Sequence, residues 1–190
     1  MAEMTSNDWH LARPRIVNTL IGGGLALAAQ LLWPSHEEER LPERLATLFQ
    51  RLREYLDSLL ADPSSEPRAR RAFGLAAANA DASFQRHLGE VAEPAERIEA
   101  YMAVLTYARR VRNSIALAAA QAGAADLRAV RPALDAALAE LRDAARERRI
   151  PRRLPPIDGP SPAAVRLARQ LEIIRSALER LASASAPAAG

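Results

Sequence analysis

An uncharged run over residues 16–33 is the strongest pattern in the chain. It contains no Asp, Glu, Lys, Arg or His, and it lies between Arg15 and Pro34. As a helix, these residues would span about 27 Å at 1.5 Å per residue. That is slightly less than the roughly 30 Å hydrocarbon core of a bilayer. The pattern favours a transmembrane helix, and the alternative is a helix buried in the core of a soluble bundle.

Small and polar side chains in this run predict how it would pack. Three consecutive glycines would weaken an isolated helix in water by roughly 1 kcal/mol each relative to alanine. In a membrane, two small-xxx-small pairs would instead let a neighbouring helix approach closely: Gly22 with Ala26, and Gly24 with Ala28. Three polar side chains would then face the interior of a multi-helix bundle or its transport pathway: Asn18, Thr19 and Gln30.

A helical period of apolar residues recurs through the rest of the chain, at the i, i+3, i+4 and i+7 spacing. It predicts helices over about 42–61, 68–88, 95–121, 126–149 and 163–182. No period-2 pattern of a strand is present. The predicted fold class is therefore all-α, with one N-terminal transmembrane helix followed by a cytoplasmic bundle of about five helices.

The same period predicts which side chains point inward. In the helix over 95–121 they include Tyr101, Met102, Leu105 and Ile115. In the helix over 68–88 they are Phe73, Ala77, Ala80, Phe84 and Leu88. In the last helix they are Val165, Ala168, Leu171, Ile174, Leu178 and Leu181.

Prolines and polar residues set the predicted boundaries. Residues 1–15 flank the membrane helix, and residues 34–149 form the helical domain. Residues 150–162 are a proline-rich linker that cannot be helical throughout. Residues 183–190 are expected to be a disordered tail.

Composition and charge limit the chemistry and suggest an orientation. Cysteine is absent, so disulfides and thiolate metal sites are excluded. All 26 basic residues are arginine. Residues 1–100 carry 11 Arg against 15 acidic residues, whereas residues 101–190 carry 15 against 8. The basic half could therefore face an anionic surface. More arginines follow the uncharged run than precede it, which favours a cytoplasmic C-terminus.

No motif in the sequence indicates a catalytic site. His10, His36 and His87 lack metal-ligand spacing, and each is expected to be solvated or to cap a helix. The glycines of the uncharged run lack the preceding strand and the following lysine of a phosphate-binding loop. We therefore expect no catalytic residue, no metal ligand and no cofactor, and an enzyme is the least supported class.

A basic stretch lies near the end of the helix over 126–149. One interpretation is a solvated helix end, where positive charge suits the helix dipole. Another is contact with anionic lipid. Binding to nucleic acid is unlikely, since no stacking aromatics or recognition motif accompany the stretch. The residues concerned are Arg146, Arg148, Arg149, Arg152 and Arg153.

Two groups of motifs together carry a family resemblance. The first is RIVNTLIGGGLALA with LLWP over residues 15–34, and the second comprises RRAF at 70–73, FQR at 84–86 and YARR at 107–110. They resemble the final membrane helix and the following cytoplasmic domain of the fusaric acid resistance family, bacterial inner-membrane proteins that include aromatic carboxylic acid exporters. Family members are several times longer, and many carry Asp where Asn18 stands, so a proton-relay role at this position is in doubt.

The resemblance implies export of small organic (aromatic) acids or hydrophobic toxicants, driven by an ion gradient, with a periplasmic adaptor protein as partner. One membrane helix cannot enclose a pathway, so we expect this segment to act with other membrane helices of a longer exporter or as a homo-oligomer. The alternative is a soluble helical protein–protein interaction module with residues 16–33 in its core.

Overall fold

The computed structural model separates the chain into two units, residues 1–36 and residues 37–190. The residues that it describes are 15–25, 37–90, 93–121, 124–159 and 161–184. In the first unit, residues 15–25 are helical. Among the helices in the described ranges, none is both long enough and apolar enough to cross a bilayer. These helices therefore do not support the predicted membrane span over 16–33, of which residues 26–33 lie outside the described ranges.

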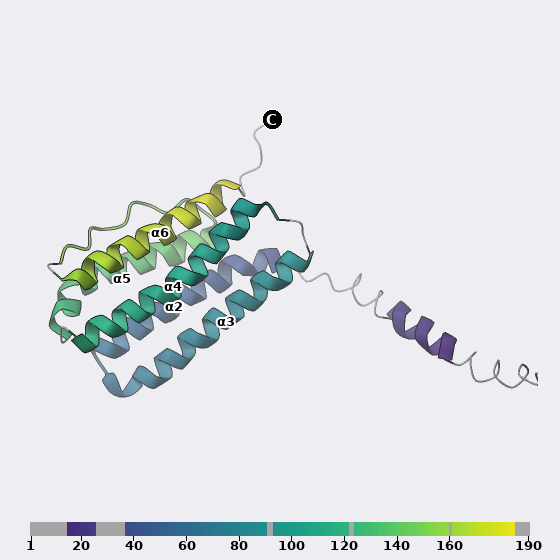
Figure 1. The fold of residues 1–190 in the computed structure, drawn as a ribbon, viewed down its shortest axis with the longest axis horizontal. Helices are drawn as coiled ribbons and strands as arrows, with labels where there is room; N and C mark the ends of the chain where they lie inside the picture. Colours follow the sequence, from purple (N-terminus) through teal and green to yellow (C-terminus); the bar gives the residue numbers. More distant parts are fainter. Residues whose placement is uncertain (1–14, 26–36, 91–92, 122–123, 160, 185–190) are drawn as a thin grey trace, which may run out of the picture. The chain divides into compact units, whose positions relative to one another are not determined.

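The second unit confirms the all-α fold and the expected number of helices, and its described residues contain no strand (Figure 1). The elements are α2 (Glu37–Leu60), the short 3-10 turn η1 (Pro63–Ser65), α3 (Glu66–Glu90), α4 (Ala95–Gln121), α5 (Ala124–Glu147) and α6 (Pro162–Ala184). The predicted boundaries differ from these by a few residues, except that α2 begins five residues before Pro42 and keeps this proline inside the helix.

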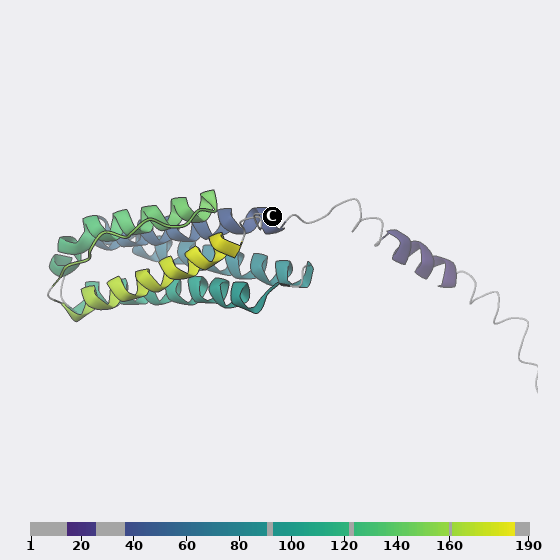
Figure 2. The ribbon, with the colours of Figure 1, turned by 90° about the horizontal axis from the view of Figure 1, so that it is seen from above.

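Packing places α2 between α3 and α5, while α4 packs mainly against α6 (Figures 1 and 2). Successive helices from α2 to α5 run antiparallel. After α5, residues 148–159 return along the bundle as an extended segment, which we call the strap. Consequently α6 runs antiparallel to α4.

The core combines large apolar side chains from all five helices with buried alanines on α3 and α4. Alanine lets the helix backbones approach closely, because it adds only a methyl group to the contact. The large, fully buried side chains include Leu48, Phe49, Leu52 and Leu56 on α2, Phe84 on α3, Ile115 on α4, and Leu134, Leu138 and Leu141 on α5; the buried alanines include Ala76, Ala77, Ala80, Ala100 and Ala108.

The prediction is wrong for two of the residues that were expected to point inward. Met102 is 45% exposed and Val165 is 64% exposed. On α6, Ala164 is buried and its neighbour Val165 is not. Successive residues of an α-helix point about 100° apart around its axis, so an error of one residue selects a different face. Apart from Ala177, the buried side chains of α6 recur at alternating steps of three and four: Ala164, Leu167, Leu171, Ile174, Leu178 and Leu181.

The strap is packed on the bundle, whereas the sequence predicted only a linker. Pro151 and Ile157 are buried, and Leu154 packs against the core. Proline has no N–H, so an extended proline-rich segment can lie against helices with few unsatisfied donors. The strap and α6 therefore belong to the same compact unit as α2 to α5.

Gly159 marks a close approach between the strap and two helices. A Cβ atom built at this position would lie 2.8 Å from the Ala164 Cβ and 3.0 Å from the Val130 Cγ1. We expect Gly159→Ala to lower the free energy of unfolding by about 1–3 kcal/mol through overpacking. Gly74→Ala in α3 is the matched control, since a Cβ there meets nothing within 4 Å.

The control should raise the free energy of unfolding by up to about 1 kcal/mol, the difference in helix propensity. Urea unfolding of the full chain in mild detergent, followed by circular dichroism, measures both. Equal stabilities of the two variants would contradict the packed position of the strap.

Candidate functional site

The helical segment 15–25 exposes its apolar side chains to solvent. Its large apolar residues are between 50% and 69% exposed: Ile16, Val17, Leu20, Ile21 and Leu25. The core of the second unit is by contrast closed, because it is built from buried residues between Leu41 and Leu181. Taken by itself, the segment is therefore a short helix with an apolar surface.

The predicted packing and pathway residues fall partly within this segment. Gly22 and Gly24 are exposed, and a Cβ at either would meet nothing within 4 Å. Asn18 is exposed, and the Thr19 hydroxyl donates to the Arg15 carbonyl of its own helix at 2.8 Å. Ala26, Ala28 and Gln30 lie outside the described residues. Packing against other helices stays a prediction for all of them.

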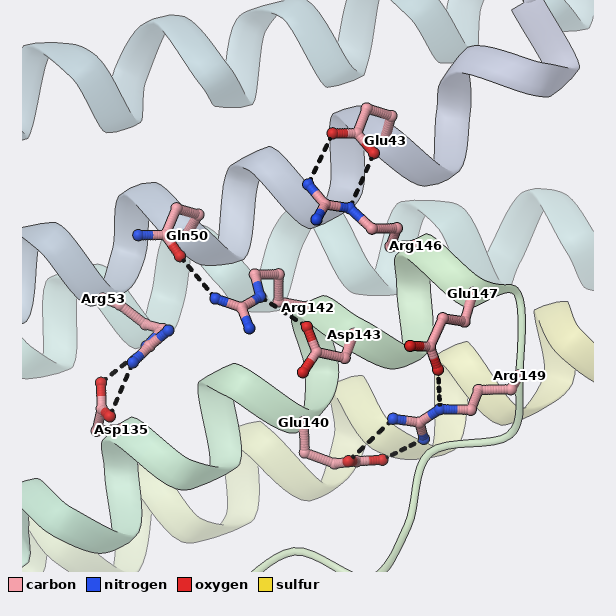
Figure 3. Close-up of polar contacts among 10 residues, drawn as sticks. All are labelled: Glu43, Gln50, Arg53, Asp135, Glu140, Arg142, Asp143, Arg146, Glu147 and Arg149. Atoms are coloured by element: carbon pink, nitrogen blue, oxygen red, sulfur yellow. Dashed lines mark hydrogen bonds and ion pairs between the residues drawn. The ribbon is translucent and has the colours of Figure 1, made fainter.

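The predicted arginine cluster is divided by ion pairs (Figure 3). Arg146 donates two hydrogen bonds to the Glu43 carboxylate on α2, at 2.9 and 3.1 Å. Arg149 donates to both Glu140 and Glu147. Three carboxylates thus offset part of the positive charge that the sequence assigned to this surface. Arg152 and Arg153 have exposed side chains on the strap.

Glu140 is the residue that joins the strap to α5. Its carboxylate accepts from the Arg149 guanidinium and also from the backbone N–H of Arg152 at 2.7 Å. The Arg149 guanidinium holds the pKa of Glu140 below its ordinary value, and burial partly opposes this effect. The basic stretch therefore has a structural role in fixing the start of the strap.

Further ion pairs connect α2 to α5 along their length (Figure 3). Arg53 and Asp135 form a two-bond pair at 2.8 and 2.9 Å, the forked geometry that arginine and carboxylate favour. The hydrogen bond from Arg53 lowers the pKa of Asp135. Arg142 donates to Gln50 at 3.0 Å and to Asp143 at 2.8 Å.

A buried polar cluster lies where α3 meets α4. The His87 Nε2 lies 2.7 Å from the Glu93 Oε1, and the Glu93 Oε2 lies 3.1 Å from the Arg97 Nε. The three side chains are only 1%, 3% and 16% exposed, in that order. His87 is therefore not solvated, and it lies in the last turn of α3, whereas His10 and His36 lie outside the described residues.

Helical spacing could have revealed the burial of His87. Phe73, Ala77, Ala80 and Phe84 are buried at alternating steps of four and three. The next step of three reaches His87, whereas the predicted stripe took the neighbouring Leu88. Glu93 and Arg97 carry no such signal, since acidic and basic residues near a helix start are usually solvated.

The polar groups described above form hydrogen bonds and ion pairs within the fold. Across the described ranges, no group of three or more His, Cys, Asp or Glu side chains is placed to hold a metal ion.

No protein-family model matches the chain, and no curated protein or solved structure is similar enough to indicate a relationship. The family resemblance therefore rests on the residues that carry it.

Acid should weaken the attachment of the strap through Glu140. The pKa of this carboxyl is lower in the folded state than its ordinary value of about 4.5. Its contribution to stability is therefore fully present above about 4.5 and is lost as the pH falls through the lower folded value. Glu140→Gln should cost about 1–3 kcal/mol at neutral pH, because it removes a charge-assisted acceptor.

Urea unfolding at neutral and at acidic pH measures this effect. The Glu140→Gln variant should lose less stability on acidification than the unmodified chain. Glu99→Gln, at an exposed position on α4, should keep both the stability and the acid dependence of the unmodified chain. Identical acid dependence in all three proteins would contradict the role of Glu140.

Proposed function

We propose that the chain is the C-terminal segment of a bacterial inner-membrane exporter of small organic (aromatic) acids or hydrophobic toxicants. Its run over 16–33 would cross the membrane, and its helical domain would lie in the cytoplasm. The observation that carries the proposal is the apolar surface of the short helix over 15–25. Motifs that resemble those of the fusaric acid resistance family support the same assignment.

The apolar side chains of this segment support the membrane assignment. Covering a large apolar side chain contributes about 1.5–3 kcal/mol, so five such side chains on one short helix favour an apolar environment. The soluble alternative would instead bury these side chains in its core. The uncharged sequence continues to residue 33, which suits a bilayer.

This segment would work together with other membrane helices. A single helix cannot enclose a transport pathway, so further helices, from a longer exporter or from additional copies, are required. Gly22 and Gly24 would allow their close approach. Arg152 and Arg153, on the strap, are the members of the basic stretch most available to anionic lipid. A periplasmic adaptor would complete the route out of the cell.

Membrane fractionation tests the proposal. After an alkaline carbonate wash, the chain should stay in the membrane pellet. Leu20→Asp combined with Leu25→Asp should release it, because each acidic residue near the centre of a membrane helix costs about 2.5–3.5 kcal/mol. Leu75→Asp combined with Val165→Asp is the matched control, since these side chains are similarly exposed but lie on α3 and α6.

The control variant should stay in the pellet with the unmodified chain. Release of the unmodified chain by the carbonate wash would refute the membrane assignment. Release of both double variants to the same extent would show that added charge alone causes the release.

Cross-linking in membranes tests the packing face. Gly24→Leu should reduce cross-linking to neighbouring membrane helices or to other copies at least about tenfold, because a leucine side chain prevents close approach. A Cβ atom at this position meets nothing within 4 Å in the described part of the chain, so the helical domain should be unaffected. Leu25→Ile, one position along, should cross-link like the unmodified chain. Equal cross-linking of the two variants would argue against the glycine face.

A further inference from the structure

A cavity of about 110 Å³ lies between the second half of α4 and the first turns of α6. Helix α6 begins at the end of the bundle at which α4 ends (Figures 1 and 2). The polar side chains that line the cavity are Ser114, Ser161 and Arg166, and among the described residues no carboxylate lines it. It belongs entirely to the unit of residues 37–190, so what it binds is independent of the proposed membrane function.

Ser114 places a buried hydroxyl without a partner at this cavity. The residue is only 6% exposed, and it forms no hydrogen bond with any other described residue. A serine in a helix can donate to a carbonyl of the preceding turn, and Ser58 and Ser183 do so at 2.8 and 2.9 Å. Because buried polar groups are nearly always hydrogen-bonded, a hydroxyl that lacks this bond suits a site that a ligand completes.

The start of α6 adds two more donors. The Ser161 hydroxyl accepts from the Ala164 N–H at 3.3 Å, as an N-cap side chain does, so its own proton is free to donate. The Val165 N–H donates to the Ser161 carbonyl at 3.4 Å, and Pro162 has no N–H. In this first turn, the Ala163 N–H is therefore left without an acceptor among the described residues.

Arg166 supplies positive charge to the cavity. It is exposed, and unlike Arg146 and Arg149 it forms no ion pair with any described carboxylate. The last carbonyls of α4 lie at the same end of the bundle, so their partial negative charge opposes the dipole of α6. The attraction for an anion therefore comes mainly from the Arg166 guanidinium, while the hydroxyls and the free N–H provide directed hydrogen bonds.

We propose that this cavity binds a phosphate group, either of inorganic phosphate or of a small phosphomonoester. The hydroxyls of Ser114 and Ser161 donate to its oxygens. The Ala163 N–H and the Arg166 guanidinium donate as well, and both are groups with which proteins commonly hold phosphate. A phosphate group has three or four oxygens pointing in different directions, which matches donors from two helices. A carboxylate has two oxygens in one plane and less charge, so it is a poorer match.

Titration calorimetry of the full chain in mild detergent, near neutral pH and at constant ionic strength, tests this assignment. The probes are inorganic phosphate and glycerol 3-phosphate, and acetate is the comparison ligand. At least one probe should bind, and it should bind at least about tenfold more tightly than acetate. The tighter of the two shows whether the site prefers free phosphate or a phosphomonoester.

Ser114→Ala separates a binding role from a structural one. It should weaken binding of the tighter probe about tenfold, because a hydrogen bond to a charged ligand is lost. It should also raise the midpoint of thermal unfolding without ligand, because no unpartnered hydroxyl is then buried. Ser58→Ala is the matched control, since Ser58 is equally buried but its hydroxyl donates to the Tyr55 carbonyl, and it should bind the probe normally.

Arg166→Gln tests the charge. It should weaken binding of the tighter probe at least about tenfold, with an unchanged circular dichroism spectrum. Arg169→Gln removes the same charge from an exposed position three residues further along α6, and it should bind the probe normally.

Three results would overturn the assignment. The first is that neither probe binds the unmodified chain more tightly than acetate does. The second is that Ser114→Ala binds as the unmodified chain does, or is weakened no more than Ser58→Ala. The third is equal weakening by Arg166→Gln and Arg169→Gln, which would reduce the effect to overall charge.

Discussion

Burial of the apolar face of α2 holds the bundle together. This helix packs against both α3 and α5 and also contacts α4, so its side chains connect elements that are far apart in the sequence. Leu48, Phe49, Leu52 and Leu56 have no exposed surface, and each such side chain contributes about 1.5–3 kcal/mol when buried. Because α3 packs mainly on α2, loss of this face would leave α3 with little to hold it.

Ion pairs also link α2 to α5. The forked pair between Arg53 and Asp135 and the pair between Arg146 and Glu43 lie at different points along the two helices (Figure 3). The side chains of the second pair are more than half exposed, so this pair adds little stability. Because every basic residue of the chain is arginine, each can form such a forked pair.

Helical periodicity was sufficient to predict the all-α fold and the approximate extent of α2 to α6. It was insufficient only for the start of the buried face of α6, because alanines at 163, 164 and 168 blur the boundary between buried and exposed positions. The burial of His87 could be predicted from helical spacing. The burial of its partner Glu93 could not, since a carboxylate is buried only where tertiary structure supplies a donor. The packed strap and the pairing of Arg146 with Glu43 likewise depend on contacts between residues distant in sequence.

The two units differ in their apolar side chains. Residues 37–184 bury a core of their own, whereas the helix over 15–25 exposes large apolar side chains. Cysteine labelling tests this difference most directly, because the chain has no cysteine of its own. Ser6→Cys and Leu75→Cys would each be expressed in bacteria and treated with a membrane-impermeant maleimide. If residues 16–33 cross the membrane with the C-terminus inside, the first is labelled in intact cells and the second only after lysis. Labelling of both only after lysis would contradict a membrane-spanning segment.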